Sequence, residues 1–171
     1  MAVTIKTAEE IEKMRVAGRL AAEVLEMIGP HVQAGVTTDE LDHICHDYIV
    51  NVQKAIPAPL NYHGFPRSIC TSVNHVVCHG IPGEKRLKDG DILNIDVTVI
   101  VNGWFGDTSR MYVAGKLSRK AERLIDVTHD ALMLGIERAV PGRHGEVRRA
   151  LEDREVVRLL GDDRDRLDGG G

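Results

Sequence analysis

Two aspartates, Asp96 and Asp107, are the residues whose types and spacing point most clearly to chemistry. Between them stand Asn102 and Gly103, flanked by β-branched and aromatic residues. Such a pair is the strongest short-range signal of a β-hairpin, because Asn and Gly both tolerate the positive φ of a type I′ turn. With this turn Thr98 faces Asp107, so the two aspartates become diagonal cross-strand neighbours on one face of the sheet.

Carboxylates in this arrangement predict a metal site. Two like charges aimed at one spot repel each other, so a sheet rarely keeps such a pair without a cation or a shared proton. A pair of divalent ions about 3.5–4 Å apart would fit this spacing and suits hydrolysis. Two alternatives stay open from the residues alone: both aspartates are solvated on an exposed face, or a β-bulge near Gly106 turns Asp107 away.

His79 and His63 stand where functional side chains are common. His79 lies where an apolar run, expected to be a strand, breaks into Gly80 and Pro82, and His63 precedes Gly64 in a similar setting. Side chains at such positions often bind or catalyse, because a rigid element holds the loop that carries them. For the histidines in the expected amphipathic helices, a solvated or core role is the simpler interpretation.

The first helix is expected to begin at a capping box, residues 7–10, and to end at the Gly-Pro pair of residues 29–30. Gly18 interrupts its apolar stripe. A glycine inside a helix costs up to about 1 kcal/mol, which indicates either the close approach of another backbone or simple tolerance. The stripe itself comprises Ile11, Met14, Ala21, Leu25 and Ile28.

Further elements follow along the chain. A second capping box, residues 37–40, starts another helix, and Gly and Pro punctuate residues 56–82, which is typical of short strands and loops. After the hairpin, a third helix is expected from Ser118 to the Pro-Gly pair of residues 141–142. Two helices therefore precede the extended segments, and one follows the hairpin.

Composition excludes several classes of protein. The 171 residues are 43% hydrophobic, which is typical of one soluble globular domain, and no run approaches the roughly 20 apolar residues of a membrane span. Without a signal region we expect a cytoplasmic protein that contacts no membrane. Three cysteines without Cys-x-x-Cys spacing argue against a disulfide framework and a structural zinc site. A net charge of −4 with mixed signs predicts no specificity for nucleic acid.

Residues 143–171 differ from the rest, so we divide the chain into residues 1–142 and a divergent charged tail, residues 143–171. The tail is rich in Arg, Asp, Glu and Gly and contains no Lys, Phe, Tyr or Trp. One interpretation is a charged C-terminal helix with a flexible end. The other is a reading frame lost near residue 143, since such composition is typical of an alternative frame of a GC-rich gene. Translation of the neighbouring frames distinguishes the two.

Taken together, the motifs resemble the type I methionine aminopeptidases, metal-dependent exopeptidases that remove the initiator methionine from new proteins. The resemblance runs from residue 5 to residue 142. It implies the pita-bread fold, an α+β architecture of two pseudo-symmetric halves, of which this chain would form the N-terminal half with an antiparallel sheet and covering helices. The matching segments are residues 5–7, 11–22, 62–66, 70–74, 77–82, 89–91, 94–98 and 106–109.

The resemblance also implies roles for single residues. Asp96 and Asp107 match two aspartate ligands of two divalent ions (Co, Mn, Fe, Ni or Zn), with Asp107 bridging both ions. His79 matches the catalytic histidine that contacts the substrate near the scissile amide. Without the resemblance, ordinary core packing would be the preferred interpretation of the residues that match the methionine pocket. These pocket residues are Tyr62, Phe65 and Cys70.

The sequence departs from the family after residue 142. The family's other ligands, one histidine and two glutamates, come from a second half that nothing here matches, and Pro59 stands where many members have a cysteine. Two aspartates cannot complete a dinuclear site. We therefore expect a truncated chain with an incomplete metal site, inactive by itself, whose uncovered apolar surface favours self-association.

The expected function is metal-dependent removal of methionine from the N-terminus of nascent proteins, with peptides that begin with Met as substrates. One alternative is a proline-specific peptidase of the same fold, which also uses two hairpin aspartates. Residues 62–64 and 78–82 favour the methionine enzyme. Another alternative is a non-catalytic binding or complementation half-domain that associates with ribosomes, with nascent chains or with a separate C-terminal fragment.

Overall fold

The computed structural model describes residues 4–140, which divide into two compact units with their boundary in the chain between Leu117 and Ser118. The first unit holds two helices and a sheet. The second contains α3 (Arg119–Arg138), whose hydroxyl-capped start at Ser118 confirms the third predicted helix. The predicted tail, residues 143–171, lies outside the described residues.

Capping boxes start both helices of the first unit, as predicted. α1 (Ala8–Ile28) begins where the Thr7 hydroxyl accepts from the Glu10 amide at 3.2 Å and the Glu10 carboxylate accepts from the Thr7 amide at 2.8 Å. α2 (Thr38–Asp47) begins with the same reciprocal pair between Thr37 and Glu40, at 3.1 and 2.7 Å. Each box satisfies amide groups that a helix start leaves without partners.

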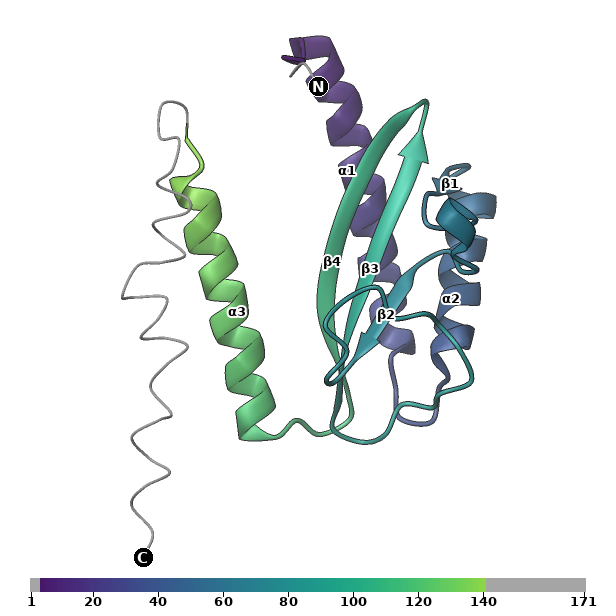
Figure 1. Ribbon diagram of the computed structural model, residues 1–171, viewed down its shortest axis with the longest axis vertical. Helices are drawn as coiled ribbons and strands as arrows, with labels where there is room; N and C mark the ends of the chain where they lie inside the picture. The colour runs from purple at the N-terminus through teal and green to yellow at the C-terminus, as the bar shows by residue number, and fades with distance from the viewer. Residues whose placement is uncertain (1–3, 141–171) are drawn as a thin grey trace, which may run out of the picture. The chain divides into compact units, whose positions relative to one another are not determined.

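The predicted apolar stripe of α1 is buried only in part. Ala21, Leu25 and Ile28 are buried, but Ile11 and Met14 are 41% and 42% exposed. In Figure 1 the N-terminal end of α1 reaches past the tip of the hairpin. The helical spacing of apolar residues in α1 therefore extends beyond the part of the helix that is buried.

An antiparallel sheet of four strands lies against α1 and α2. The strand β3 (Asp91–Val101) pairs along its whole length with β4 (Trp104–Ala114), while β1 (Ile56–Pro57) and β2 (Cys70–Val73) pair with separate parts of β3. The short strands and the loops between them confirm the expectation for residues 56–82.

The hairpin has the predicted turn and register. Asn102 and Gly103 have φ values of 50° and 83°, as a type I′ turn requires. Pairing runs without interruption from the turn to Asp91 opposite Ala114, so no bulge occurs at Gly106. Thr98 lies opposite Asp107, as the sequence predicts.

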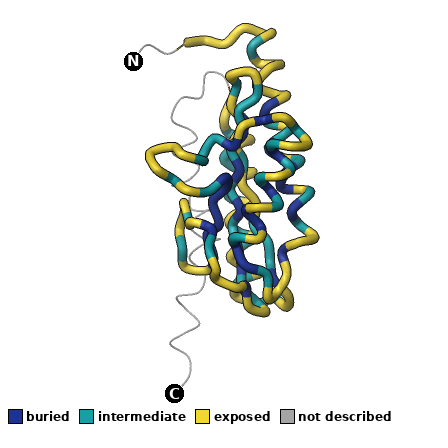
Figure 2. Tube along the Cα trace, turned by 90° about the vertical axis from the view of Figure 1, so that its right-hand side faces the viewer, coloured by how far each residue is buried: buried dark blue, intermediate teal, exposed yellow. Residues whose placement is uncertain are grey.

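The hydrophobic core lies between the sheet and the two helices. Alternate residues of β3 are fully buried (Leu93, Ile95, Val97 and Val99) and join the apolar faces of α1 and α2 in one cluster. Figure 2 shows these buried segments where the strands and helices face each other. Because side chains alternate along a strand, the residues between them, among them Asp96 and Thr98, project from the opposite face.

Candidate metal and substrate site

Asp96 and Asp107 lie on the same face of the hairpin, in adjacent cross-strand rows. Asp96 pairs with Ser109, and Asp107 pairs with Thr98 in the next row toward the turn. The Thr98 hydroxyl donates to Oδ1 of Asp107 at 3.1 Å. The hairpin thus gathers two carboxylates and a hydroxyl on the face opposite to α1 and α2.

The Asp107 carboxyl group acts directly on Asp96. Burial raises the pKa of Asp96 above its ordinary value, the charge of Asp107 raises it further, and so does a hydrogen-bonding contact with the Asp107 carboxyl. The charge of His79 acts in the opposite direction. A divalent cation would relieve the repulsion between the carboxylates, and carboxylate oxygens are ligands that such cations accept.

Cys70 lies beside both aspartates. It pairs with Asp96 across β2 and β3 and is buried. Burial, followed by the charge of Asp96, raises the pKa of its thiol to about 11, and Asp107 contributes as well. The structure therefore brings this one predicted pocket residue into the carboxylate site, with its sulfur in the neutral form that suits an apolar side chain.

Tyr62 and Phe65 belong to a different segment, a one-turn helix at Tyr62–Gly64 and the residue after it. The Tyr62 side chain is 69% exposed and contacts the ring of His63 edge-on, with 4.4 Å between ring centroids. Phe65 is half-buried. The role of both residues in a methionine pocket remains a prediction.

His79 does not follow a strand, contrary to the prediction. β2 ends at Val73, Asn74 takes a positive φ of 55°, and the apolar run that follows continues as a loop in which Val77 is 93% exposed. His79 itself has a φ of 53°. The apolar character of this segment therefore led to a wrong prediction of a strand. The charge of His79 nevertheless lowers the pKa of Asp96, as expected of a residue near the carboxylates.

Asp42 is a buried carboxylate that sequence reasoning missed. It accepts hydrogen bonds from the amides of Ser68 at 2.8 Å and Ile69 at 3.0 Å, directly before Cys70, and is only 5% exposed. Beside it, Nδ1 of His46 lies 2.7 Å from the Ser68 hydroxyl. An acidic residue between Leu41 and Cys45, on the apolar face of a helix, is the signal that could have identified it.

The Asp42→Asn variant is expected to change how stability depends on pH. Burial raises the pKa of Asp42 above 3.8, and the amides of Ile69 and Ser68 offset part of that shift. Because the folded state binds this proton more tightly than the unfolded chain, the stabilisation is greatest at low pH. It falls as the pH rises from 3.8 through the higher folded-state value.

An asparagine can still accept both amide bonds but does not titrate. The free energy of unfolding of the variant, relative to wild type, should therefore rise across that interval and level off above it. Urea denaturation at a series of pH values measures this difference, with the exposed Asp47→Asn as control. A difference that falls with pH would contradict the buried position of the carboxyl.

The described residues offer a partial donor set for a metal. Within residues 4–140, no group of three or more His, Cys, Asp or Glu residues is arranged to hold an ion. Asp96 and Asp107 fit a divalent cation by charge and by oxygen chemistry, but an ion prefers at least four ligands. The remaining donors must come from outside this part of the chain or from water.

No described helix is both long and apolar enough to be a candidate membrane span.

Comparisons with known proteins agree with this geometry. Residues 12–154 match the sequence profile of metallopeptidase family M24. A methionine aminopeptidase from Salmonella typhimurium is 64% identical over 143 residues, which is 83% of this chain and 54% of that protein. The chain spans about half the length of the curated relatives it matches.

Solved structures show the same relationship. The crystal structure of methionine aminopeptidase from Rickettsia prowazekii has a TM-score of 0.84 and 54% identity, over 90% of this chain and 63% of that one. Prolidase from Pyrococcus furiosus has a TM-score of 0.71 at 22% identity, over 92% of this chain and 44% of that one, which shows the fold alone. These likenesses confirm the predicted pita-bread α+β fold and the predicted resemblance to methionine aminopeptidases. The chain therefore belongs to metallopeptidase family M24.

Proposed function

We propose that this chain forms the aspartate-bearing half of a methionine aminopeptidase, which removes methionine from the N-terminus of peptides. The observation that carries the proposal is the hairpin register, which puts Asp96 and Asp107 on one face with interacting carboxyl groups. A sequence 64% identical to a methionine aminopeptidase supports the same reaction.

The family implies divalent metal ions, and Asp96 and Asp107 are the residues that would hold them here. Such ions, when bound, supply Lewis-acid chemistry for peptide hydrolysis. The chain's own part is to present two carboxylates at fixed separation, with the Thr98 hydroxyl orienting the Asp107 carboxylate through the 3.1 Å bond. We propose Co, Mn, Fe, Ni or Zn as the metal.

His79 and Cys70 complete the proposed contacts of this half with substrate. The side chain of His79 is exposed, and its charge acts on Asp96, so its imidazole can donate a hydrogen bond to a peptide near the carboxylates. Cys70, which pairs directly with Asp96 across β2 and β3, offers an apolar, polarisable surface that suits a thioether. Tyr62 and Phe65 are proposed as further walls of the methionine pocket.

Complementation is the form of this function that the structure favours. The described residues bring two carboxylates to the site and no third metal-binding side chain, so we propose that this half becomes active only with a partner that provides the rest. Self-association through exposed apolar side chains and association with ribosomes are further proposals. We place the protein in the cytoplasm, where nascent chains are made.

Hydrolysis of Met-Ala-Ser tests the proposal. The purified chain, with added Co²⁺ or Mn²⁺, is expected to give no turnover. Addition of the separately expressed C-terminal half of the Salmonella typhimurium relative is expected to give turnover. The Asp107→Asn variant should lose this turnover, because a neutral amide is a poor replacement for a carboxylate that would hold a divalent ion, whereas Asp47→Asn should keep it.

Three outcomes would argue against the proposal. Clear turnover by the chain alone would contradict its incompleteness. Turnover that survives Asp107→Asn would contradict the assigned ligand. Release of an N-terminal residue only from peptides with proline at the second position would favour the proline-specific alternative instead.

A further inference from the structure

The loop that carries His79 is held from two sides. On the sheet side, the Gly80 carbonyl accepts from the Thr71 amide at 2.8 Å, and the Gly80 amide donates to the Ser72 hydroxyl at 3.2 Å. A Cβ at position 80 would lie 2.0 Å from the Thr71 carbonyl oxygen. Only glycine allows this approach, so residue 80 is fixed against β2 directly after His79.

On the helix side, the same loop satisfies the free amides at the start of α2. The Gly83 carbonyl accepts from the Asp39 amide at 3.0 Å, and the Lys85 carbonyl accepts from the Thr38 amide at 3.1 Å. The Thr38 hydroxyl also accepts from the Gly83 amide at 2.9 Å and donates to the Gly83 carbonyl at 3.0 Å. Helix amides that would otherwise lack partners thus anchor residues 83–85.

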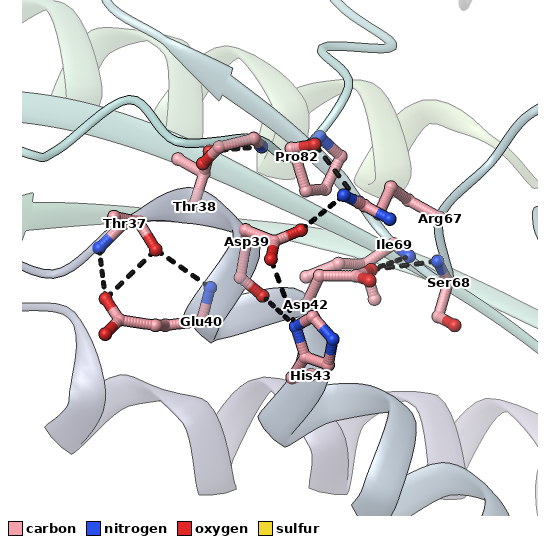
Figure 3. Close-up of polar contacts among 11 residues, drawn as sticks. Thr37, Thr38, Asp39, Glu40, Asp42, His43, Arg67, Ser68, Ile69 and Pro82 are labelled. Atoms are coloured by element: carbon pink, nitrogen blue, oxygen red, sulfur yellow. Dashed lines mark hydrogen bonds and ion pairs between the residues drawn. The ribbon is translucent and has the colours of Figure 1, made fainter.

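Arg67 joins these parts. Its Nε donates to the Pro82 carbonyl at 3.2 Å, and its Nη2 lies 2.6 Å from Oδ1 of Asp39. Figure 3 shows the guanidinium between Pro82 and the first turn of α2. The side chains of Arg67 and Asp39 are 34% and 19% exposed, so this ion pair is partly shielded from water. A planar guanidinium with several fixed donors can make both contacts at once.

We propose that Arg67 is a positioning residue for His79, acting through Asp39 and the Pro82 carbonyl. His79 holds a positive φ of 53°, which a residue other than glycine keeps only when its surroundings impose it. Gly80 fixes the chain after His79 toward β2, and Arg67 fixes it two residues later toward α2. The relevance to catalysis rests on the proposed function, whereas the positioning itself does not.

The same face of α2 aligns the other side of the site. Asp42 holds Ser68 and Ile69, the residues between Arg67 and Cys70. One helix therefore sets the placement of Cys70, through Asp42, and of His79, through Arg67. This predicts that loss of Arg67 disturbs His79 and leaves Cys70 in place.

NMR relaxation on the isotope-labelled chain tests the inference without requiring turnover. In wild type, the backbone order parameters of His79, Gly80 and Cys70 are expected at about 0.85. In Arg67→Ala, those of His79 and Gly80 should fall to about 0.6 or below, with shifted His79 ring signals, while Cys70 stays rigid. Arg67→Lys keeps the charge but lacks the guanidinium geometry, so it should restore the order only in part.

Arg86→Ala is the matched control. The Arg86 guanidinium donates to the Gly35 carbonyl at 2.7 Å, so this variant also removes one arginine-to-carbonyl bond beside the same segment. It should leave His79 unchanged. If Arg67→Ala does not fold, Asp39→Asn decides, because it removes the ion pair and keeps the backbone bond to Gly83.

Unchanged backbone order parameters and ring signals of His79 in Arg67→Ala, or in Asp39→Asn if Arg67→Ala does not fold, would overturn the inference. An equal loss of order in Arg86→Ala would overturn it as well, since the effect would then belong to the segment and not to Arg67. Failure of the peptidase assay leaves these measurements unaffected, so the two proposals fail separately.

Discussion

Replacing Gly106 by alanine is expected to lower the free energy of unfolding by about 3 kcal/mol or more, at the upper end of what overpacking costs. Gly106 is buried in β4, where the hairpin meets α1. A Cβ there would lie 2.1 Å from the Ala17 carbonyl oxygen, 2.2 Å from the Ala17 carbonyl carbon and 2.6 Å from the Gly18 nitrogen. All three are backbone atoms, so the whole helix must move away from the sheet.

Gly18→Ala is the matched control on the other side of this contact. Nothing lies within 4 Å of a Cβ added at Gly18. In the middle of a helix, alanine is favoured over glycine by roughly 0.5–1 kcal/mol, so this variant should be more stable than wild type. Urea denaturation followed by circular dichroism compares the two. Equal effects of the two substitutions would show that α1 and β4 are not in close backbone contact.

Loss of a hairpin carboxylate is expected to remove cation binding from the sheet face. Asp96→Asn and Asp107→Asn each eliminate one of the two carboxylates that lie on the same face of the β3–β4 hairpin. The double variant eliminates both carboxylates of this pair. Changes next to metal ligands already cost roughly 10–100-fold in affinity. Removal of a ligand should therefore weaken Mn²⁺ binding at this face by at least about 10-fold.

Asp47→Asn controls for the general loss of negative charge. Asp47 is an exposed residue of α2 whose carboxylate accepts from the Asn51 side chain at 2.6 Å. Its replacement lowers the net negative charge by the same amount as each single hairpin variant. Mn²⁺ binding that weakens equally in all three variants would indicate diffuse electrostatic attraction instead of a site.

Local signals made much of this fold predictable. The two capping boxes and the Asn102-Gly103 turn depend on residues within four positions of each other, and the structure has all three where the sequence predicted them. The turn also fixed the register of the long hairpin, since a one-residue slip would move every side chain to the other face. The shared face of Asp96 and Asp107 followed from the turn together with the uninterrupted pairing of the hairpin, because a bulge near Gly106 would have turned Asp107 away.

Contacts between distant segments account for what the sequence did not predict. The glycine that the close backbone contact requires is Gly106, which is far from α1 in the chain, whereas nothing lies within 4 Å of a Cβ added at Gly18, so Gly18 fits the interpretation of a tolerated glycine. The exposure of Ile11 and Met14 depends on where the hairpin ends relative to α1. The loop at His79 was misidentified because its anchors, on α2 and β2, supply no periodic pattern within the loop itself.

The roles of single residues also depend partly on contacts between distant segments, which the sequence does not specify. Cys70 joins the aspartates through strand pairing, which the sequence could not specify without the position of β2. Tyr62 and Phe65 were assigned through family resemblance, and among the described residues the ring contact of Tyr62 is with His63 and not with the carboxylates. The sequence did not identify Asp42 and Arg67 as site residues, because an isolated charged side chain on a helix or loop is usually solvated.

Paramagnetic broadening by Mn²⁺ in the NMR spectrum of this chain tests the central claim most directly. At low Mn²⁺ concentration, the signals of Asp96 and Asp107 and of their cross-strand partners Ser109 and Thr98 are predicted to broaden first. The Asp96→Asn, Asp107→Asn double variant is predicted to lose that effect. Broadening that begins elsewhere in the chain, or that persists at the hairpin in the double variant, would contradict the assignment of this carboxylate pair as the metal-binding part of the site.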